Sequence, residues 1–176
     1  MPPVLRPSEL GDIPAITGIY AHAVRFGTAS FELEPPGEAE MSRRRSGLLE
    51  GGFPYWVAEV DGEVAGYAYA GPYRARPAYR STVEDSVYVD AARHGQGIGR
   101  LLLGALITEA AARGFRQMIG VIGDSASTGS IRLHESTGFR RVGVLEAVGY
   151  KHGRWLDTVL MQRDLGVGSA GPPTWT

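Results

Sequence analysis

The sequence predicts a single α/β (α+β) domain in which helices cover both faces of one β-sheet. Strand-like and helical segments alternate along the 176 residues, and a tight hairpin requires two of the strands to be antiparallel neighbours. No internal repeat or change of composition divides the chain. We therefore expect one domain over residues 1–165, followed by a flexible C-terminal tail over residues 166–176.

The N-terminal third predicts a strand and two helices. A short strand begins at Val4, and the apolar residues between Ile13 and Ala23 fall on one face of a helix. Residues 26–36 have no usable period and end in two prolines, so we expect a surface loop there, followed by a second helix near residues 38–49.

A β-hairpin is predicted next, over residues 55–60 and 63–69. The intervening Asp61-Gly62 is the two-residue turn that type I′ geometry requires. Residues 71–81 contain two prolines and several arginines, and on their own they indicate a solvated connection.

The centre of the chain predicts strand, glycine loop and helix in succession. The strand covers Val83 to Val89, the loop carries alternating glycines over residues 95–99, and the helix ends at Gly114. A helix that begins at a glycine-rich turn directs unpaired amides and the positive end of its dipole at whatever lies there. This stretch is therefore a candidate anion site.

The C-terminal third predicts three strands and one short helix. In order, these are a strand at residues 117–122, a helix at residues 131–136, and strands at residues 139–145 and 155–165 that are joined through residues 147–154.

Composition excludes several functions. The chain has no cysteine, which removes thiol catalysis, disulfides and cysteine-based metal sites, and we expect no metal. A net charge of −1 argues against a general nucleic-acid surface. There is neither a secretory segment nor a run of about 18 apolar residues, so we expect no membrane span and, by default, a cytoplasmic protein.

Three kinds of glycine loop compete at residues 95–99. A phosphate-binding P-loop requires Lys and then Ser or Thr after the last glycine, whereas Arg100 and Leu101 follow here. A dinucleotide loop requires a different glycine spacing and an earlier place in the chain. The third possibility is a loop that binds the pyrophosphate of coenzyme A through successive main-chain amides.

The segment RHGQGIGRLLL, which follows a strand ending in SVYV, resembles the coenzyme A loop of the GNAT superfamily of N-acetyltransferases. The glycines match at Gly97 and Gly99, and the chain departs from the family pattern at His94. Four longer stretches, VAEVDGEVAGYAYAGPYRARPAY, TVEDSVYV, IRLHESTGF and GYKHGRWLD, resemble the phosphinothricin and methionine sulfoximine acetyltransferase branch.

This resemblance implies the GNAT fold, with a mixed, mostly antiparallel twisted sheet. It also implies acetyl transfer from acetyl-CoA to the α-amino group of a small glutamate-like amino acid, such as phosphinothricin, methionine sulfoximine or methionine sulfone. A homodimer is usual in this branch. The resemblance leaves open an acetyltransferase of another amine, such as a polyamine or a protein N-terminus, and a non-catalytic module that binds acyl-CoA.

The resemblance further implies where acetyl-CoA binds. The amide of Val89 could contact the thioester oxygen, and Ser127 stands where relatives commonly place an asparagine, so we expect weakened or rearranged binding there. The full set of implied coenzyme residues is Val87, Tyr88, Val89, His94, Gly95, Gln96, Gly97, Ile98, Gly99, Arg100, Ser127 and Ser130.

Direct transfer in a ternary complex needs a base, because an α-amine is mostly protonated at pH 7. Glu84 matches the catalytic glutamate of the branch, and the alternative is that it pairs with a nearby arginine. In a strand Glu84 and Ser86 share one face and Asp85 takes the other. His134 stands where many relatives carry a tyrosine that protonates the coenzyme A sulfur, and a structural role for it is equally open.

The family's substrate loop matches Arg74, Arg76 and Tyr79 position by position. Two cations suit a substrate with an α-carboxylate and a second anionic or polar group. Phe31 either reaches into the pocket or anchors its loop. The implied substrate-binding residues are Arg74, Arg76, Tyr79, Glu84, Asp85, Ser86 and Phe31.

Overall fold

The computed structural model describes residues 2–174. Its regular elements, in chain order, are β1 (Val4–Pro7), α1 (Ile13–Phe26), α2 (Glu38–Glu50), β2 (Tyr55–Val60), β3 (Glu63–Pro72), β4 (Thr82–Val89), α3 (Ile98–Ala112), β5 (Gln117–Gly123), α4 (Thr128–Ser136), β6 (Arg140–Lys151) and β7 (Arg154–Asp164). Within the described residues, no helix is long and apolar enough to cross a membrane.

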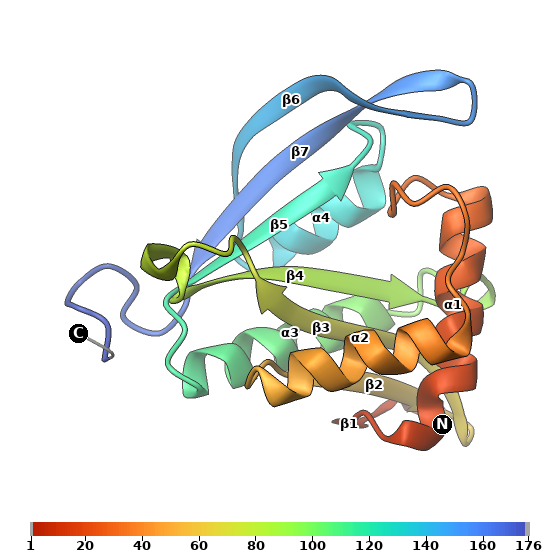
Figure 1. Ribbon diagram of the computed structural model, residues 1–176, viewed down its shortest axis with the longest axis horizontal. Coiled ribbons are helices and arrows are strands. Elements are labelled where there is room, and N and C mark those ends of the chain that lie inside the picture. The colour runs from red at the N-terminus through yellow and green to blue at the C-terminus, as the bar shows by residue number, and fades with distance from the viewer. Residues whose placement is uncertain (1, 175–176) are drawn as a thin grey trace.

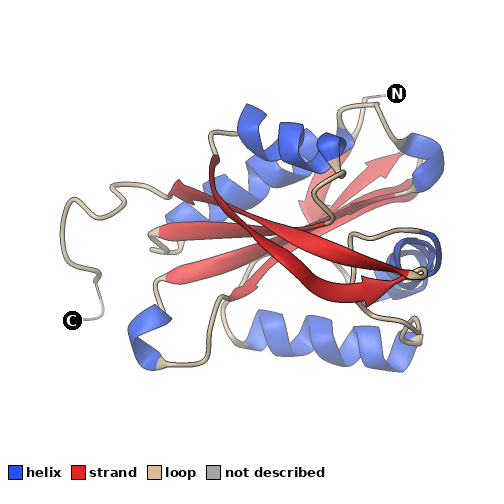
Figure 2. Cartoon of the chain, turned by 90° about the horizontal axis from the view of Figure 1, so that it is seen from above, coloured by secondary structure: helices blue, strands red, loops and turns tan. Residues whose placement is uncertain are grey.

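The strands form one seven-stranded sheet in the order β1-β2-β3-β4-β5-β7-β6. Neighbouring strands are antiparallel except for β4 and β5, which are parallel. Helices lie on both sides of this twisted sheet (Figure 2). The mixed, mostly antiparallel sheet covered on both faces is confirmed.

The sheet opens between β4 and β5. These two strands pair only over Thr82–Glu84 and Gln117–Ile119, and beyond that point they diverge (Figure 1). On its other side β4 stays paired with β3 as far as Val89. The result is a fork, defined here as the gap between residues 85–89 of β4 and residues 120–123 of β5.

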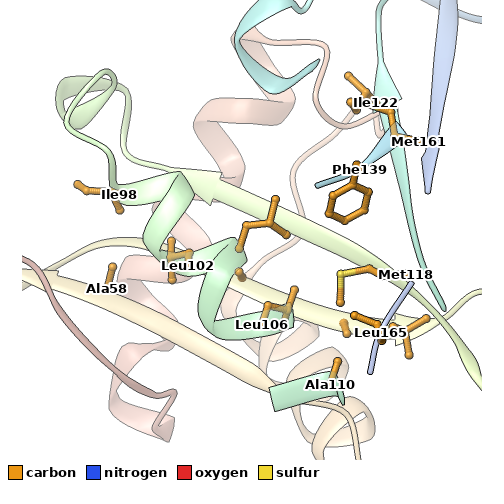
Figure 3. Close-up of a cluster of buried hydrophobic side chains, with 14 of the residues drawn as sticks. Ala58, Ile98, Leu102, Leu106, Ala110, Met118, Ile122, Phe139, Met161 and Leu165 are labelled. Atoms are coloured by element: carbon orange, nitrogen blue, oxygen red, sulfur yellow. The ribbon is translucent and has the colours of Figure 1, made fainter. Parts of the chain in front are cut away.

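One hydrophobic core holds α3 against the sheet beside this fork. Leu102, Leu103 and Leu106 are fully buried on the inner face of α3, where they pack with Met118 of β5 and with residues of the other strands (Figure 3). Full burial of each such side chain contributes about 1.5–3 kcal/mol. The glycine loop at the start of α3 is thereby fixed relative to the fork.

A second core lies under α1 on the opposite face. Ile16 of α1 packs on Val57 and Tyr67, which are fully buried. Tyr67 and Tyr88 stack with ring centroids 5.3 Å apart, which ties β3 to β4 on this face. The two cores therefore hold β4 from both sides.

The predicted hairpin turn and helix end are confirmed. Asp61 and Gly62 have φ of 53° and 82°, as a type I′ turn requires. The helix before Gly114 ends there, and Gly114 has φ of 88°. Such positive values suit a glycine that closes a helix.

The predicted ends of several elements are wrong. Residues 147–151 are not a connection, because β6 continues to Lys151 past an irregularity in its pairing with β7 at residues 145–149. The turn is instead His152-Gly153, both with positive φ. β3 also extends to Pro72, and α4 begins at Thr128 rather than at residue 131.

The segment predicted as a flexible tail makes specific contacts. The Arg116 guanidinium donates to the carbonyl oxygens of Gly168, Gly171 and Pro172. Residues 175–176 of that segment lie outside the described residues. Whether residues 166–176 are flexible in solution stays a prediction.

Candidate active site

A cavity of about 580 Å³ runs from the fork to the glycine loop. Fifteen of the predicted site residues line it: Glu84, Asp85, Ser86, Val87, Tyr88, Val89, His94, Gly95, Gly97, Ile98, Gly99, Arg100, Ser127, Ser130 and His134. These residues come from β4, the loop after it, α3, α4 and the residue before α4, so the fold brings two distant parts of the sequence to one cavity.

The glycine loop has the geometry of an anion site. Gly95 and Gly97 both have φ of 78°, which favours glycine, and Gly97 is the residue before α3. The first amides of α3 have no partner within the helix. Gly99 has a different role, because a Cβ there would lie 3.3 Å from the Leu133 side chain of α4. Its absence lets α3 and α4 approach closely.

The backbone of β4 presents polar groups to the fork. The amide of Asp90 donates to the Ala65 carbonyl, so the pair Val89 and Gly66 is of the type that exchanges no hydrogen bonds. By the same alternation, the amides of Val87 and Val89 point away from β3 and toward the gap. The predicted contact from the Val89 amide is therefore geometrically available.

His94 and Ser127, the two departures from the family pattern, both bond to the protein itself. Nε2 of His94 lies 3.0 Å from the Val89 carbonyl oxygen, which accepts from it. The Ser127 hydroxyl donates to the Gly123 carbonyl at 2.9 Å. These two side chains therefore bond to the last residues of β4 and β5, where the strands line the cavity.

Glu84 is half-buried at the closed end of the fork. It has no hydrogen-bond or ion-pair partner among residues 2–174. The alternative that it merely pairs with an arginine is therefore wrong for the described chain. Burial, with a smaller contribution from the charge of Asp85, raises the pKa of the Glu84 carboxyl above its ordinary value.

Asp85, on the other face of β4, is buried against His134. Its Oδ1 lies 2.9 Å from Nε2 of His134, and both side chains are at most 5% exposed. The Nδ1 of His134 faces the Ser130 carbonyl at 2.7 Å. Burial lowers the pKa of the imidazole, but the hydrogen bond and charge of Asp85 outweigh it, so the pKa is raised.

Three predicted substrate residues lie outside the cavity wall. The Arg74 guanidinium lies over the rings of Tyr73 and Tyr79, at 5.2 and 5.8 Å from their centroids. Arg76 is exposed. Their loop joins β3 to β4, so it begins and ends beside the Glu84 end of the fork.

Phe31 and Gln96 also do not line the cavity wall. The Phe31 ring lies against Gly123 of β5 and Gly149 of β6, where a Cβ would come within 2.8 and 2.4 Å of it. Two glycines thus make a slot for this ring, which supports the anchoring alternative. The loop that Phe31 anchors still reaches the cavity through Ala29.

Comparisons with known proteins identify the family. Residues 18–139 match the Acetyltransferase (GNAT) family. The chain is 54% identical over 162 residues to a phosphinothricin N-acetyltransferase of Alcaligenes faecalis, covering 92% of this chain and 82% of that protein. It is 40% identical over 162 residues to an L-methionine sulfoximine/L-methionine sulfone acetyltransferase of Pseudomonas paraeruginosa, covering 92% and 94%. The chain belongs to the GNAT acetyltransferase family.

A solved structure agrees with this assignment over nearly the whole fold. The GNAT phosphinothricin acetyltransferase from Sinorhizobium meliloti, in complex with AcCoA, superposes with a TM-score of 0.96 at 48% identity. The match covers 99% of this chain and 94% of that one. The chain is therefore an N-acetyltransferase with the GNAT fold.

Some residues of this GNAT site were not predicted from the sequence. They are Ala29, Arg93, Val121, Ile122, Gly123, Gly129 and Leu133. Most are apolar or glycine and lie across the fork from β4, so their types alone carried no functional signal. Arg93 was noticeable as a cation beside His94, within the glycine-loop motif.

Proposed function

We propose that this GNAT enzyme transfers the acetyl group of acetyl-CoA to the α-amino group of a small glutamate-like amino acid. The observation that carries the proposal is the position of Glu84. It is an unpartnered, half-buried carboxylate on the same strand whose amides face the cavity leading to the glycine loop. A base and an acetyl-donor site thus share one continuous element.

The described residues fit acetyl-CoA. The amides of the glycine loop and the start of α3 suit its pyrophosphate, and the amides of Val87 and Val89 suit the polar groups of its pantetheine arm. When bound, acetyl-CoA supplies the acetyl group as a thioester. The Val89 amide stabilises negative charge on the thioester oxygen.

Glu84 acts as the general base in a direct transfer. A raised pKa makes the Glu84 carboxylate a stronger base than an ordinary glutamate. It accepts a proton from the substrate amine, directly or through one water, and the neutral amine attacks the acetyl carbon. As the C–N bond forms, the C–S bond breaks and coenzyme A leaves as a thiolate. The nitrogen loses its second proton, and the thiolate takes up a proton from solvent to give the free thiol. No acyl-enzyme forms, in keeping with the absence of cysteine.

The substrate class rests on two observations. Arg76 has no carboxylate partner among residues 2–174, and Arg74 is held on two tyrosine rings at the Glu84 end of the fork. The pair suits a substrate with an α-carboxylate and a second polar or anionic group. The names of the two relatives described above support phosphinothricin, methionine sulfoximine and methionine sulfone.

A homodimer is the proposed state of the enzyme. β6 is an edge strand, and it carries a surface of exposed apolar side chains that we call the β6 patch: Val142, Val144, Leu145, Val148 and Tyr150, with Trp155 of β7. Exposed apolar edge strands invite pairing. We also propose a cytoplasmic location, where acetyl-CoA is available, which cell fractionation would test.

The substrate proposal is tested by measuring thiol release from acetyl-CoA. The panel contains phosphinothricin, methionine sulfoximine and methionine sulfone, with spermidine and an N-terminal peptide as competing amines. We expect turnover of the amino-acid analogues and little of the others. Turnover of only the polyamine or the peptide would overturn the substrate class, and acetyl-CoA binding without turnover of any amine would favour a binding module.

A further inference from the structure

The buried pair of Asp85 and His134 has a role that its geometry specifies. Asp85 follows directly after the last residue of β4 that pairs with β5, and His134 reaches it from α4. Both line the cavity next to Glu84. A buried, unpaired carboxylate beside the proposed base would be unfavourable for both groups. The net charge of the Asp85–His134 pair therefore affects how readily Glu84 ionises.

The hydrogen bonds of His134 define how many protons the pair holds. Nδ1 faces the carbonyl oxygen of Ser130 at 2.7 Å, and a carbonyl only accepts, so Nδ1 carries a proton. The 2.9 Å contact between Nε2 and Oδ1 of Asp85 then needs one proton between them. With that proton the pair has no net charge. Without it, a lone pair faces a carboxylate in a buried site.

Within the described part of the chain, no other side chain forms an ion pair with Asp85 or His134. Gly120 of β5 lies against both residues, the Phe139 ring lies edge-on to His134 at 4.9 Å, and Ser130 contributes its carbonyl. The charge of Asp85 acts on the neighbouring Glu84. The second oxygen of Asp85, Oδ2, has no hydrogen-bond partner in the described chain.

His134 is also poorly placed to donate a proton to the coenzyme. Both of its ring nitrogens face protein acceptors, and its side chain is only 5% exposed. A proton donor to the departing sulfur needs a free N–H directed at the cavity. The geometry therefore favours an electrostatic role over proton donation.

We propose that His134 is a positioning residue that supplies the counter-charge of Asp85, so that the two form a neutral unit and Glu84 can ionise and act as the base. This inference rests on the proposed function of Glu84. The raised pKa of His134 agrees with it, since burial alone would remove the proton. Asp85 thus acts through His134 and Glu84 rather than on the substrate.

The test is a suppression experiment on the pH dependence of kcat/KM. His134→Gln leaves the Asp85 charge uncompensated, so the acidic limb should move to higher pH and activity near neutral pH should fall. Adding Asp85→Asn removes that charge, so the double variant should regain the wild-type limb and most of the lost activity. Asp85→Asn alone should leave the acidic limb at its wild-type position, because the substituted pair also carries no net charge.

The control is a buried acid in a different part of the fold. Asp12 accepts two hydrogen bonds from Arg6 at 2.8 Å, and Asp12→Asn should leave the pH profile unchanged. If Asp85→Asn does not suppress the His134→Gln defect, the charge role is wrong. A uniform loss of kcat in both His134 variants without a shift of the limb would indicate proton donation and overturn the proposal.

A second readout does not depend on activity. Nuclear magnetic resonance of the ring nitrogens should show that His134 keeps both ring protons at neutral pH, and that Asp85→Asn lowers the pH at which it loses one. An unchanged His134 titration in Asp85→Asn would overturn the inference. Because this measurement needs no substrate, it stands even if no amino acid is acetylated.

Discussion

Two adjacent carboxylates of β4 have opposite environments, and strand geometry is the reason. Successive side chains of a strand point to opposite faces, so Glu84 faces the α1 side and Asp85 the α4 side. Glu84 is half-buried and lacks a partner, whereas Asp85 is buried against His134. At the scale of single residues, burial and one hydrogen bond give two identical functional groups different surroundings, on which the different roles proposed for them rest.

Substitution of Gly120 tests how tightly the Asp85–His134 pair is packed. A Cβ at this position would lie 2.8 Å from Cδ2 of His134 and 3.3 Å from Oδ2 of Asp85. Gly120→Ala should therefore displace the pair, destabilise the protein by about 1–3 kcal/mol and lower kcat. Thermal unfolding and thiol-release assays measure the two effects.

The matched control is Gly104→Ala on α3. A Cβ at Gly104 meets nothing within 4 Å, and alanine is favoured over glycine inside a helix by about 0.5–1 kcal/mol. This variant should be slightly more stable with unchanged kcat. If Gly120→Ala behaves in the same way, the described packing around His134 is incorrect.

The sequence supports part of this site at the residue scale. Alternation along a strand predicts that Glu84 and Asp85 point apart, and resemblance selects Glu84 as the base. The contact between Asp85 and His134 was not predictable, since it joins residues 49 positions apart and depends on how α4 packs against Gly120. The slot for Phe31 likewise depends on two glycines in different strands.

Among the elements, the loop between α1 and α2 is held against the end of β6 and contributes one residue to the cavity. The Lys151 ammonium at the end of β6 donates to the Ser30 carbonyl at 2.7 Å, and the adjacent His152 bonds to the Gly27 carbonyl at 3.1 Å. Tyr20 of α1 bonds to the Ser30 hydroxyl. The loop is thus fixed to β6, and Ala29 within it lines the cavity.

Lys151→Met tests this anchoring. Methionine has a similar length but no donor, so the buried Ser30 carbonyl loses its partner at a cost of about 1–3 kcal/mol. Amide hydrogen exchange over residues 27–36 should become faster, and KM for the amino acid should rise. Arg113→Met is the control, because its exposed pair with Glu109 contributes little. Unchanged exchange in Lys151→Met would contradict the anchoring role.

Most elements were predictable, and the largest error concerns the end of β6. Period and turn signals predicted the hairpin, the helices and the central strand. β6 was predicted to end at residue 145, with residues 147–154 as the connection to the next strand. The structure instead accommodates an irregularity with Ala147 at φ of 51°, stabilised by a bond from its amide to Asp157. A partner 10 residues away decides that conformation.

At the scale of the whole molecule, the sheet has two very different edges. β1 is a short strand of four residues, whereas β6 is long, and its β6 patch is exposed. An apolar surface of this kind on an edge strand is costly to leave in water. The asymmetry is why we place the dimer contact on β6.

Introducing positive charge into the β6 patch should separate the protomers. The double variant Leu145→Lys, Val148→Lys introduces two cations that repel their copies across the proposed symmetric contact. Sedimentation should therefore show a monomer for the double variant and a dimer for the wild type. Val4→Lys, on the opposite edge strand, should remain a dimer. A double variant that sediments like the wild type would exclude the β6 patch as the interface.

The fork sets the relative positions of the proposed base and the glycine loop, which lie at the two ends of one cavity. Glu84→Gln keeps the size of the side chain and removes the base. Because the glycine loop is untouched, the Kd for acetyl-CoA measured by calorimetry should stay the same. Glu109→Gln, on the outer surface of α3, is the control and should behave as the wild type.

The most direct test is the pH dependence of kcat for wild type and Glu84→Gln with methionine sulfone. Wild-type kcat should fall as the pH decreases through the raised pKa of Glu84, because protonation removes the base. In Glu84→Gln that limb should disappear and kcat near neutral pH should be lower by about 10²–10⁴-fold. An unchanged kcat with the same acidic limb would contradict the assignment of Glu84 as the base.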